Sequence, residues 1–464
     1  MGRHRLRSRR SDEGSPEQRS ASDSVGLLTC LLLLLFIIPA RQVIGPLGGA
    51  GSPASLFGLW LLVWRAGARV RSRQLRPPTQ PMRTAIAAYL TVLLISYTLA
   101  ATRSITGAEL RAADRALLST LAWTGMALAV AEAISTRERL EVFLRRLVLL
   151  TEVFALVGVW QHFTGFDVAA RLHIPGLRDN ASYSSISVRG GINRPAATAT
   201  HPIEFGFVLA LVLPLAFHFA FLKPAGKRFR AWAGVGVILV AIPMSLSRSA
   251  VVATLIGLLV MLPTWPAQHR RRLLAVFPFF AIALRVAVPG LVGTISNLFT
   301  AIASDSSTTA RTDDYTAAAR YITERPLFGR GVGTFLPIPY RVLDNQYLHT
   351  LIEGGVAGLL AFVALFVVGI MLARRARALL PDAPGKDLAQ ALVASISAAM
   401  VSVVTFDALS FPLGVSVLFL CFGSSGALWR LARQGAVVDR ADDELALADV
   451  AAVRAHERTP VEAV

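Results

Sequence analysis

The hydrophobic positions of this chain gather in long blocks that polar segments separate. Most blocks hold roughly 20 residues, the length that an α-helix needs to cross the hydrocarbon core of a bilayer. The pattern is typical of a polytopic membrane protein and predicts an all-α bundle of about twelve transmembrane helices. The twelve blocks are residues 25–40 and windows centred on 43–64, 84–101, 116–134, 140–162, 202–222, 231–246, 249–264, 272–290, 346–373, 388–407 and 410–430.

Two parts of this pattern are ambiguous. The second block is interrupted by Gly48, Gly49, Gly51 and Pro53. The stretch 231–264 would be about 50 Å long as one helix, whereas the hydrocarbon core is roughly 30 Å thick. Basic clusters precede it at 227–230 and follow it at 270–272, so a single crossing would leave one cluster on the wrong side. We therefore expect two short helices that turn at residues 245–249.

Both ends of the chain are polar. Residues 1–24 are rich in arginine and serine, and we expect a disordered basic cytoplasmic tail. The apolar block that follows could imitate a signal peptide, but it lacks a small-x-small cleavage site and many more blocks come after it. We expect it to remain as the first helix of a membrane domain over 25–430, with a cytoplasmic tail over 431–464.

Composition agrees with the pattern and excludes a soluble enzyme. Hydrophobic residues make up 54% of the 464 residues and charged residues only 16%, against about 25% in soluble domains. In a soluble chain, the net charge of +18 would suggest nucleic acid as a partner. In a membrane protein, the positions of the arginines instead indicate which side of the bilayer each segment occupies. The two cysteines, Cys30 and Cys421, lie in apolar runs and form neither a disulfide framework nor a metal-ligand spacing.

The basic residues predict the topology. With twelve crossings and a cytoplasmic N-terminus, 32 of the 47 Lys and Arg residues fall in cytoplasmic segments and 14 fall outside, while Arg285 lies within a span. Every cytoplasmic segment then holds at least three of them, as the positive-inside rule requires. We expect both termini in the cytoplasm and the two long loops, 163–201 and 291–345, on the outer side.

The second long loop has internal structure. Residues 312–314, Thr-Asp-Asp, form a good helix start, and Tyr315, Ala318, Ala319 and Ile322 follow at helical spacing until Pro326. A glycine-rich turn over 327–333 comes next. We expect a lid with an amphipathic helix. The glycines do not form a nucleotide-binding loop, because no Gly-Lys-Ser/Thr follows them.

Charge beside apolar spans on the outer side marks the candidate chemistry. Arg248 lies between Ser247 and Ser249 at the predicted turn. It could be an arginine that snorkels to the interface, but a guanidinium at a broken hairpin suits bidentate phosphate binding, which we favour. Arg194 opens a polar strip that ends at His201 and Pro202. This strip could be an ordinary loop before a helix, or an anion site where an arginine lies beside a helix N-terminus.

A third strip, residues 343–358, leads into the tenth block. Asp344 and His349 are five residues apart, so on one helix they would differ by roughly 140° and would not share a face. With Asp344 as the cap, both could still border one cavity. Each residue also has a structural interpretation, Asp344 as a plain N-cap and His349 as a satisfied interfacial histidine.

The order of these motifs resembles the O-antigen ligase and polymerase superfamily of bacterial surface-polysaccharide enzymes. The resemblance covers roughly residues 190–375 in motif and the whole chain in topology. The motifs are Arg-x(n)-Thr-x-His-Pro-x-x-Phe-Gly, Ser-x-Ser-Arg-Ser, Pro-Leu-Phe-Gly-x-Gly-x-Gly and Asp-Asn-x-Tyr-Leu, with Glu-Gly-Gly-x-x-Gly after the last.

The resemblance implies a metal-independent glycosyltransferase of the GT-C type in the bacterial plasma membrane, with no cofactor. Such enzymes transfer glycan from an undecaprenyl pyrophosphate carrier to an acceptor on the outer face. Membrane lipid and other proteins of polysaccharide assembly are the implied partners, and nucleic acid is not one. Fixed cations would stabilise the pyrophosphate leaving group, and a base would deprotonate the acceptor hydroxyl.

The resemblance assigns these roles to particular residues. Asp344 and His349 are the alternative catalytic bases. Asp344 stands where ligases that attach glycan to lipid A core carry a histidine, so we favour a polymerase of repeat units or a member with another acceptor. The candidates for binding pyrophosphate and glycan are Arg194, His201, Arg248, Arg311, Arg330, Arg341, Asn345 and Tyr347.

A transporter or flippase for a lipid-linked oligosaccharide is the competing class, since it would also need outward arginines and many spans. Transporters commonly show two related halves with broken helices in matching positions. The two long loops here are unequal, and every motif lies after residue 190. We therefore favour the enzyme, and a scaffold role has the least support.

Overall fold

A computed structural model describes residues 16–457 apart from 72–79, 181–185, 190, 289, 291–292 and 294–305. Helices account for 77% of the chain and sheet for very little, which confirms the all-α membrane class. The long elements are α1 (Pro16–Ile37), α2 (Pro53–Arg71), α3 (Pro81–Ala101), α4 (Gly107–Ala133), α5 (Arg137–Thr164), α7 (Pro202–Phe221), α8 (Ala225–Met244), α9 (Arg248–Met261), α10 (Ala267–Ala287), α12 (Ser306–Glu324), α13 (Gln346–Leu379), α14 (Ala383–Ser402) and α15 (Pro412–Glu457).

The short elements lie in the connections. They are the helical turns η1 (Gly45–Gly51), α6 (Val168–Arg171), η2 (Leu262–Thr264) and η3 (Ala408–Ser410), and the strands β1 (Gln42–Val43), β2 (Arg178–Asp179), β3 (Ser187–Arg189) and β4 (Ile192–Arg194). Strand β1 pairs with β2 and β3 pairs with β4, both antiparallel. The first long loop therefore contains two small ribbons.

Each of the twelve predicted blocks coincides with a helix, but the count of twelve membrane spans does not hold. Within the described residues, five helices are long and apolar enough to cross a membrane: α3, α4, α7, α13 and the part of α15 up to Val437. A sixth is added if η1 and α2, bent by 72°, form one span. The described apolar part of α1, and α9 with η2, are too short, and α5 and α10 carry several arginines each.

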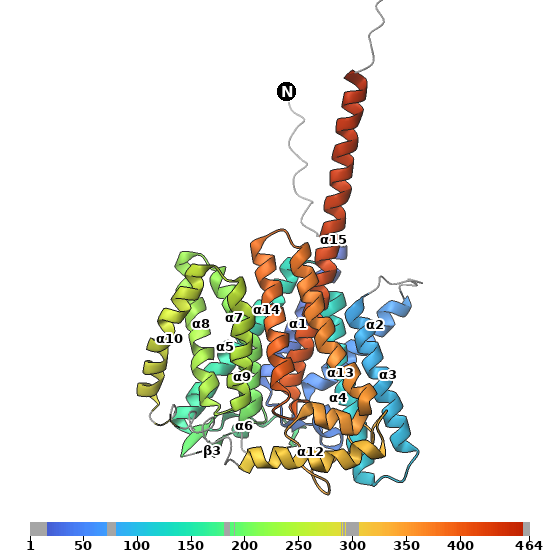
Figure 1. Ribbon diagram of the computed structural model, residues 1–464, viewed down its shortest axis with the longest axis vertical. Helices are drawn as coiled ribbons and strands as arrows, with labels where there is room; N and C mark the ends of the chain where they lie inside the picture. The colour runs from blue at the N-terminus through green and yellow to red at the C-terminus, as the bar shows by residue number, and fades with distance from the viewer. Residues whose placement is uncertain are drawn as a thin grey trace, which may run out of the picture.

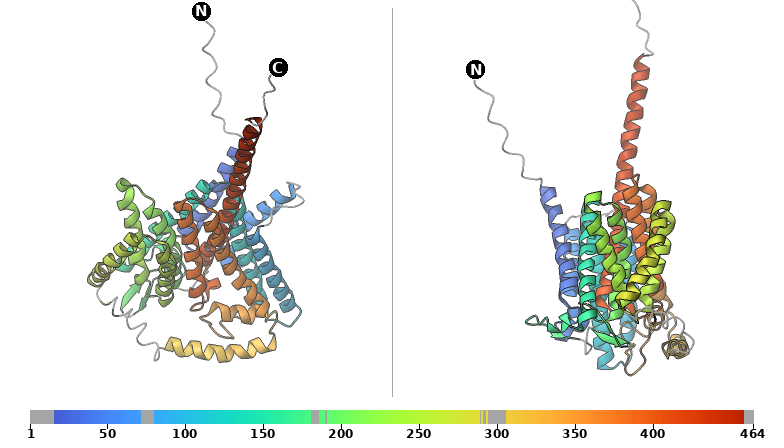
Figure 2. Two further views of the ribbon diagram at one scale, coloured as in Figure 1. Left: turned by 45° about the horizontal axis from the view of Figure 1, so that its top comes forward. Right: turned by 90° about the vertical axis from the view of Figure 1, so that its left-hand side faces the viewer.

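The ends of the chain also differ from expectation. Helix α1 begins at Pro16, within the segment expected to be disordered, and residues 1–15 lie outside the described part. Helix α15 continues out of the bundle to Glu457, through most of the segment expected to be a tail. Both Figure 1 and Figure 2 place the start of α1 and the far end of α15 at one end of the molecule. Helix α12 lies across the opposite end, which we call the α12 end.

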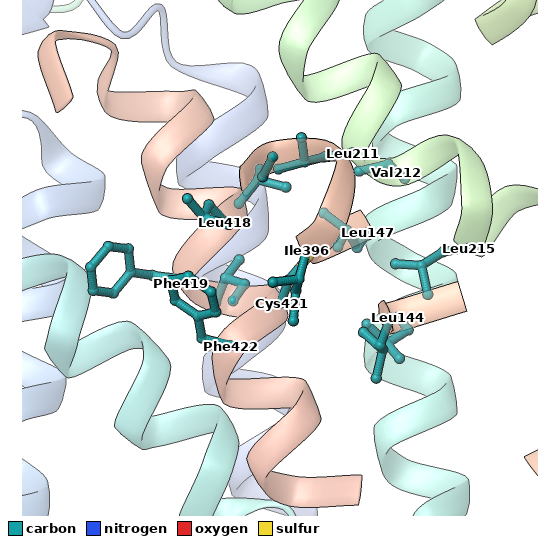
Figure 3. Packing of buried hydrophobic residues seen from close by; sticks show 14 of the residues in the cluster. Leu144, Leu147, Leu211, Val212, Leu215, Ile396, Leu418, Phe419, Cys421 and Phe422 are labelled. Carbon is teal, nitrogen blue, oxygen red and sulfur yellow. The ribbon is translucent and has the colours of Figure 1, made fainter. Parts of the chain in front are cut away.

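Helices α7, α14 and α15 form the centre of the bundle. In α7 and α15, 94% of the apolar window is buried, whereas in α3 the figure is 28%. Burial of this extent makes α7 and α15 the helices on which the others pack. Figure 3 shows side chains from α5, α7, α14 and α15 meeting in this core: Leu144, Leu147, Leu211, Val212, Leu215, Ile396, Leu418, Phe419, Cys421 and Phe422.

The predicted turn between two short helices is confirmed. Helix α8 ends at Met244 and α9 begins at Arg248. Ser247 is the N-cap of α9, where its side chain accepts a hydrogen bond from the backbone N–H of Ala250. Leu246, between them, has a φ of 46°, a left-handed conformation that is uncommon for a branched residue and is held by its surroundings.

The glycine-rich turn after α12 packs on a break in α13. The backbone N–H of Arg330 donates to Ile352 O (2.9 Å) and that of Gly331 to Glu353 O (2.9 Å). The break lies at Gly355, whose φ of 64° is non-helical. A Cβ on Gly355 would lie 2.3 Å from Leu327 O, so no other residue fits there.

We predict that Gly355→Ala destabilises the protein by about 2–4 kcal/mol, because it adds a backbone clash to an unfavourable φ. Its neighbour Gly354 is the matched control, since a Cβ there meets nothing within 4 Å. Thermal unfolding in detergent should show a lower midpoint for Gly355→Ala and an unchanged or slightly higher one for Gly354→Ala. Equal midpoints for the two variants would contradict the packed turn.

Helix α12 starts earlier than predicted and turns a different face inward. It begins at Ser306 instead of near Thr312 and ends at Glu324, just before Pro326 as expected. Ala318 is buried with Phe335, Leu343, Leu348 and Ile352, while Tyr315 is exposed. The prediction was wrong for Tyr315 and Ala319 because Asp314, buried against Arg341, takes a place on the inner face that an apolar pattern does not reveal.

Candidate functional site

Arg194 is bound to the turn that leads into Arg248. Arg194 ends β4, and its Nε donates a hydrogen bond to Ser245 O at 2.9 Å. Arg248, three residues after Ser245, is the first residue of α9. The side chains of Arg194 and Arg248 are both half-buried. Burial, with the charge of Arg189 in support, lowers the pKa of Arg194 to about 10, so the guanidinium stays charged at neutral pH.

The strip after Arg194 is held from several sides. The side chain of Gln161, at the end of α5, accepts from Ala197 N (2.7 Å) and donates to Ala197 O (3.3 Å). Thr198 donates its hydroxyl to Phe36 O at 2.8 Å. Ala197 has a φ of 52°, which such a tight, doubly bonded turn can maintain. The strip is therefore a fixed wall and not a loose connection.

Glu204 ties this wall to the start of α15. The fully buried carboxylate accepts from Thr200 N and the Thr200 hydroxyl, both at 2.7 Å. Its other oxygen accepts from the backbone N–H groups of Leu413 (2.7 Å) and Gly414 (3.1 Å). Four donors satisfy the buried charge, and the start of α7 is thereby fixed against that of α15.

His201 is the N-cap of α7. Its Nδ1 accepts from Ile203 N at 3.1 Å, so the proton is on Nε2. Burial, together with the charge of Arg194, lowers the pKa of His201 from 6.5 to about 4. The imidazole is neutral at neutral pH and Nε2–H remains a donor.

We predict that His201 makes stability depend on pH between about 6.5 and 4. The unfolded chain takes up a proton near 6.5 and the folded one only near 4, so the fold loses stability as pH falls through this window. His201→Asn keeps a capping side chain without the titration. Unfolding midpoints should fall less steeply with acid in this variant, and an unchanged slope would contradict the assignment.

The strip around Asp344 lies at the start of α13. Asn345, not Asp344, is the N-cap: its Oδ1 accepts from Leu348 N (3.1 Å), and its Nδ2 donates to the Tyr315 hydroxyl of α12 (3.3 Å). Asp344 precedes the cap and is exposed. Tyr347 points into the bundle, where its hydroxyl donates to Met400 O at 2.6 Å.

His349 lies between two carboxylates. Its Nδ1 is 3.0 Å from Asp407 Oδ1, and its Nε2 is 3.3 Å from Glu353 Oε1. Burial alone would raise the pKa of Asp407, but the adjoining His349 lowers it below its ordinary value. Asp407 is not among the candidates that the sequence motifs contain. Its one signal was an acid at the end of the apolar block 388–407, where a charge is costly.

The connection that carries Asp407, residues 403–411, joins the predicted strips to one another. The Thr405 hydroxyl donates to Ser249 Oγ at 2.7 Å, next to Arg248. Gln346 N donates to Val403 O at 3.0 Å. The ring of Phe411 lies 5.9 Å from that of His201. The structure thus brings Arg194, His201, Arg248, Asn345 and His349 into one network at the α12 end.

Two of the loop arginines hold the loop itself. Arg330 donates to Glu109 Oε1 at 2.9 Å and lies over the ring of Tyr340 at 4.1 Å. The Tyr340 hydroxyl donates to the same oxygen at 2.7 Å. Arg341 pairs with Asp314 of α12 at 2.5 Å. Arg311 belongs to α12, but its side chain lies outside the described part.

The surroundings of this network add two facts. A small cavity of about 10 Å³ lies between the ends of α1, α2 and α15, with an apolar lining broken by serines: Leu34, Leu35, Ile38, Pro39, Ala40, Ser52, Pro53, Ala54, Ser55, Pro412, Leu413 and Ser416. In the part of the chain that the structure describes, no group of three or more His, Cys, Asp or Glu side chains is arranged to hold a metal ion.

An apolar helical bundle with a network of arginines, acids and histidines at one end defines an integral-membrane protein with a polar site. Residues 233–363 match the family model described as O-antigen ligase, a range that runs from α8 into α13 and includes Arg248, Asp344 and His349. The match confirms the resemblance to the O-antigen ligase and polymerase superfamily and supports a membrane enzyme of that type. No curated protein matches the chain.

Proposed function

We propose that this protein is a membrane glycosyltransferase that transfers or polymerises glycan repeat units from an undecaprenyl pyrophosphate carrier. One observation carries the proposal: Arg194 is hydrogen-bonded to the turn that leads into Arg248, within the network that also holds the start of α13. Two guanidinium groups at a helix N-terminus suit a pyrophosphate, which carries several negative charges. The O-antigen ligase match includes this turn.

We further propose a GT-C-type arrangement of the membrane helices, with the α12 end on the outer face. Two of the helices that could span alone, α7 and α15, lie at the centre of the bundle, where the other helices pack on them. The start of α1 and the end of α15 lie at the same end, as an even number of crossings requires. The basic residues favour that end as cytoplasmic.

In the proposed reaction the acceptor hydroxyl oxygen attacks the anomeric carbon of the carrier-linked glycan. The bond from that carbon to the pyrophosphate oxygen breaks, and the carrier pyrophosphate leaves with the bonding electron pair. A base accepts the hydroxyl proton. Arg194 and Arg248 stabilise the charge that develops on the leaving group, and this positive charge makes a metal ion unnecessary.

We propose Asp344 as the base in place of His349. The exposed carboxylate of Asp344 precedes the cap of α13 and can reach an acceptor. Both ring nitrogens of His349 face carboxylates, whose negative charges favour the imidazolium, and an imidazolium has no lone pair for the acceptor proton. An acid in this position favours joining of repeat units over ligation to lipid A core.

The purified protein in detergent, supplied with lipid-linked repeat units and no nucleotide, should lengthen the glycan on the carrier, and a chelator should not slow it. Micelles have no compartments, so a transporter or flippase gives no product in this assay. Absence of lengthened glycan with authentic lipid-linked units would overturn the proposal in favour of transport.

A further inference from the structure

His349 and its two acids come from two separate parts of the α12 end. His349 and Glu353 are four residues apart on the first turns of α13, and Asp407 precedes η3. The Glu353 carboxylate also accepts from Phe335 N at 3.0 Å, in the segment after the glycine-rich turn. Asp407 Oδ2 accepts a hydrogen bond from the Ser410 hydroxyl. The imidazole therefore links α13 to the connection between α14 and α15.

The charge state of His349 follows from its neighbours. Two carboxylate oxygens lie 3.0 Å and 3.3 Å from the two ring nitrogens, and their negative charges stabilise the imidazolium. Two aromatic side chains also face this cluster. The ring centroid of Phe335 lies 5.9 Å from that of His349, and Tyr89 of α3 interacts electrostatically with Glu353. A cation between two acids, largely shielded from water, is held more firmly than an exposed pair.

The same connection is fixed on both sides of Asp407. Gln346 forms two hydrogen bonds with this connection. Its backbone N–H donates to Val403 O, and its side-chain Oε1 accepts from Leu409 N at 2.7 Å. Thr405 reaches Ser249, one residue from Arg248. A change in the Asp407–His349 pair would therefore reach both the start of α13, where Asp344 lies, and the start of α9, where Arg248 lies.

We propose that Asp407 is a positioning residue for the transfer reaction: it holds His349 as a permanent imidazolium and so fixes Asp344 relative to Arg248. The inference rests on the proposed function and adds to it a residue that the motifs do not contain. The imidazolium neither gives nor takes a proton in the cycle. Its charge and its two contacts keep three parts of the site in one arrangement.

The test compares Asp407→Asn with Asp387→Asn in the full-length protein. Asp387 pairs with His218 at 2.7 Å across α7 and α14, so Asp387→Asn removes a carboxylate from a histidine of the central helices. Asp407→Asn should lower kcat about tenfold with KM nearly unchanged, and should add an ionisation near pH 6.5 to the activity profile as His349 begins to titrate. Asp387→Asn should keep the wild-type kcat and profile.

The second measurement does not depend on activity. Nitrogen-15 NMR of histidine-labelled wild-type protein should show His349, assigned with His349→Gln, doubly protonated at pH 7. In Asp407→Asn the same signal should titrate within about one unit of 6.5. A neutral His349 at pH 7 in the wild type would overturn the inference, whether or not the variants fold.

The two proposals fail in different ways. If the wild-type protein has a charged His349 but no transfer activity, the proposed function is wrong. The imidazolium then has no transfer reaction to support. An active wild type with wild-type kcat and pH profile in Asp407→Asn overturns the positioning role alone. Equal effects of Asp407→Asn and Asp387→Asn would assign both to general packing and also overturn it.

Discussion

Arg248→Lys should lose transfer activity by on the order of 100-fold while the protein inserts and folds normally. Lysine keeps the charge but not the planar fork that binds two phosphate oxygens at once. Arg248 begins α9 directly after the Ser247 cap, so its side chain starts from a fixed point and a shorter-reaching point charge cannot compensate. The measurement is the initial rate of glycan lengthening at matched protein concentration.

Arg374→Lys is the control for this substitution. Arg374 is an exposed residue near the far end of α13, remote from the α12 end, and its replacement changes the same functional group. We expect the wild-type rate for it and a wild-type unfolding midpoint for both variants. Near-wild-type turnover of Arg248→Lys would contradict bidentate phosphate binding by Arg248.

Asp344→Asn should lower kcat by on the order of 100-fold or more, because the amide cannot accept the hydroxyl proton. Asp344 is exposed and is not the cap of α13, so the substitution should leave the fold intact. His349→Gln should lower activity less, since we assign it a structural charge and not the proton transfer. Rates of both variants over pH 5–9 separate the two roles.

Glu324→Gln provides the comparison for loss of one negative charge in the same loop. Glu324 is an exposed residue at the end of α12, paired only loosely with Arg320 at 3.5 Å. It should retain full activity. If His349→Gln is the slower variant and Asp344→Asn is nearly active, the histidine is the base and the proposed division of roles is wrong.

Much of the helix order could be predicted from the sequence, because length and charge are local properties. The turn at residues 245–249 followed from a stretch too long for one crossing and from basic residues on both sides of it. The number of spans did not follow, because a helix such as α5 buries its apolar face against α7 and α8 while its charged residues lower its mean hydropathy.

The site was only partly predictable because its bonds connect distant parts of the chain. Arg194, Arg248 and His349 could be selected as charges beside apolar blocks. Arg330 looked similar by that criterion, but its partner Glu109 is 221 residues away, and no local pattern shows that contact. Asp407 was missed because its connection holds no basic residue, so the charge count passed over it.

We propose that Arg248, the Arg194 side chain bound to the preceding turn and the start of α13 together form a glycosyltransferase site. The experiment is to count undecaprenyl pyrophosphate released against glycosidic bonds formed by the purified wild-type protein in micelles. We expect one carrier released for each bond, with both lost together in Arg248→Lys and Asp344→Asn. No carrier released from authentic lipid-linked repeat units, or release without new bonds, would contradict it.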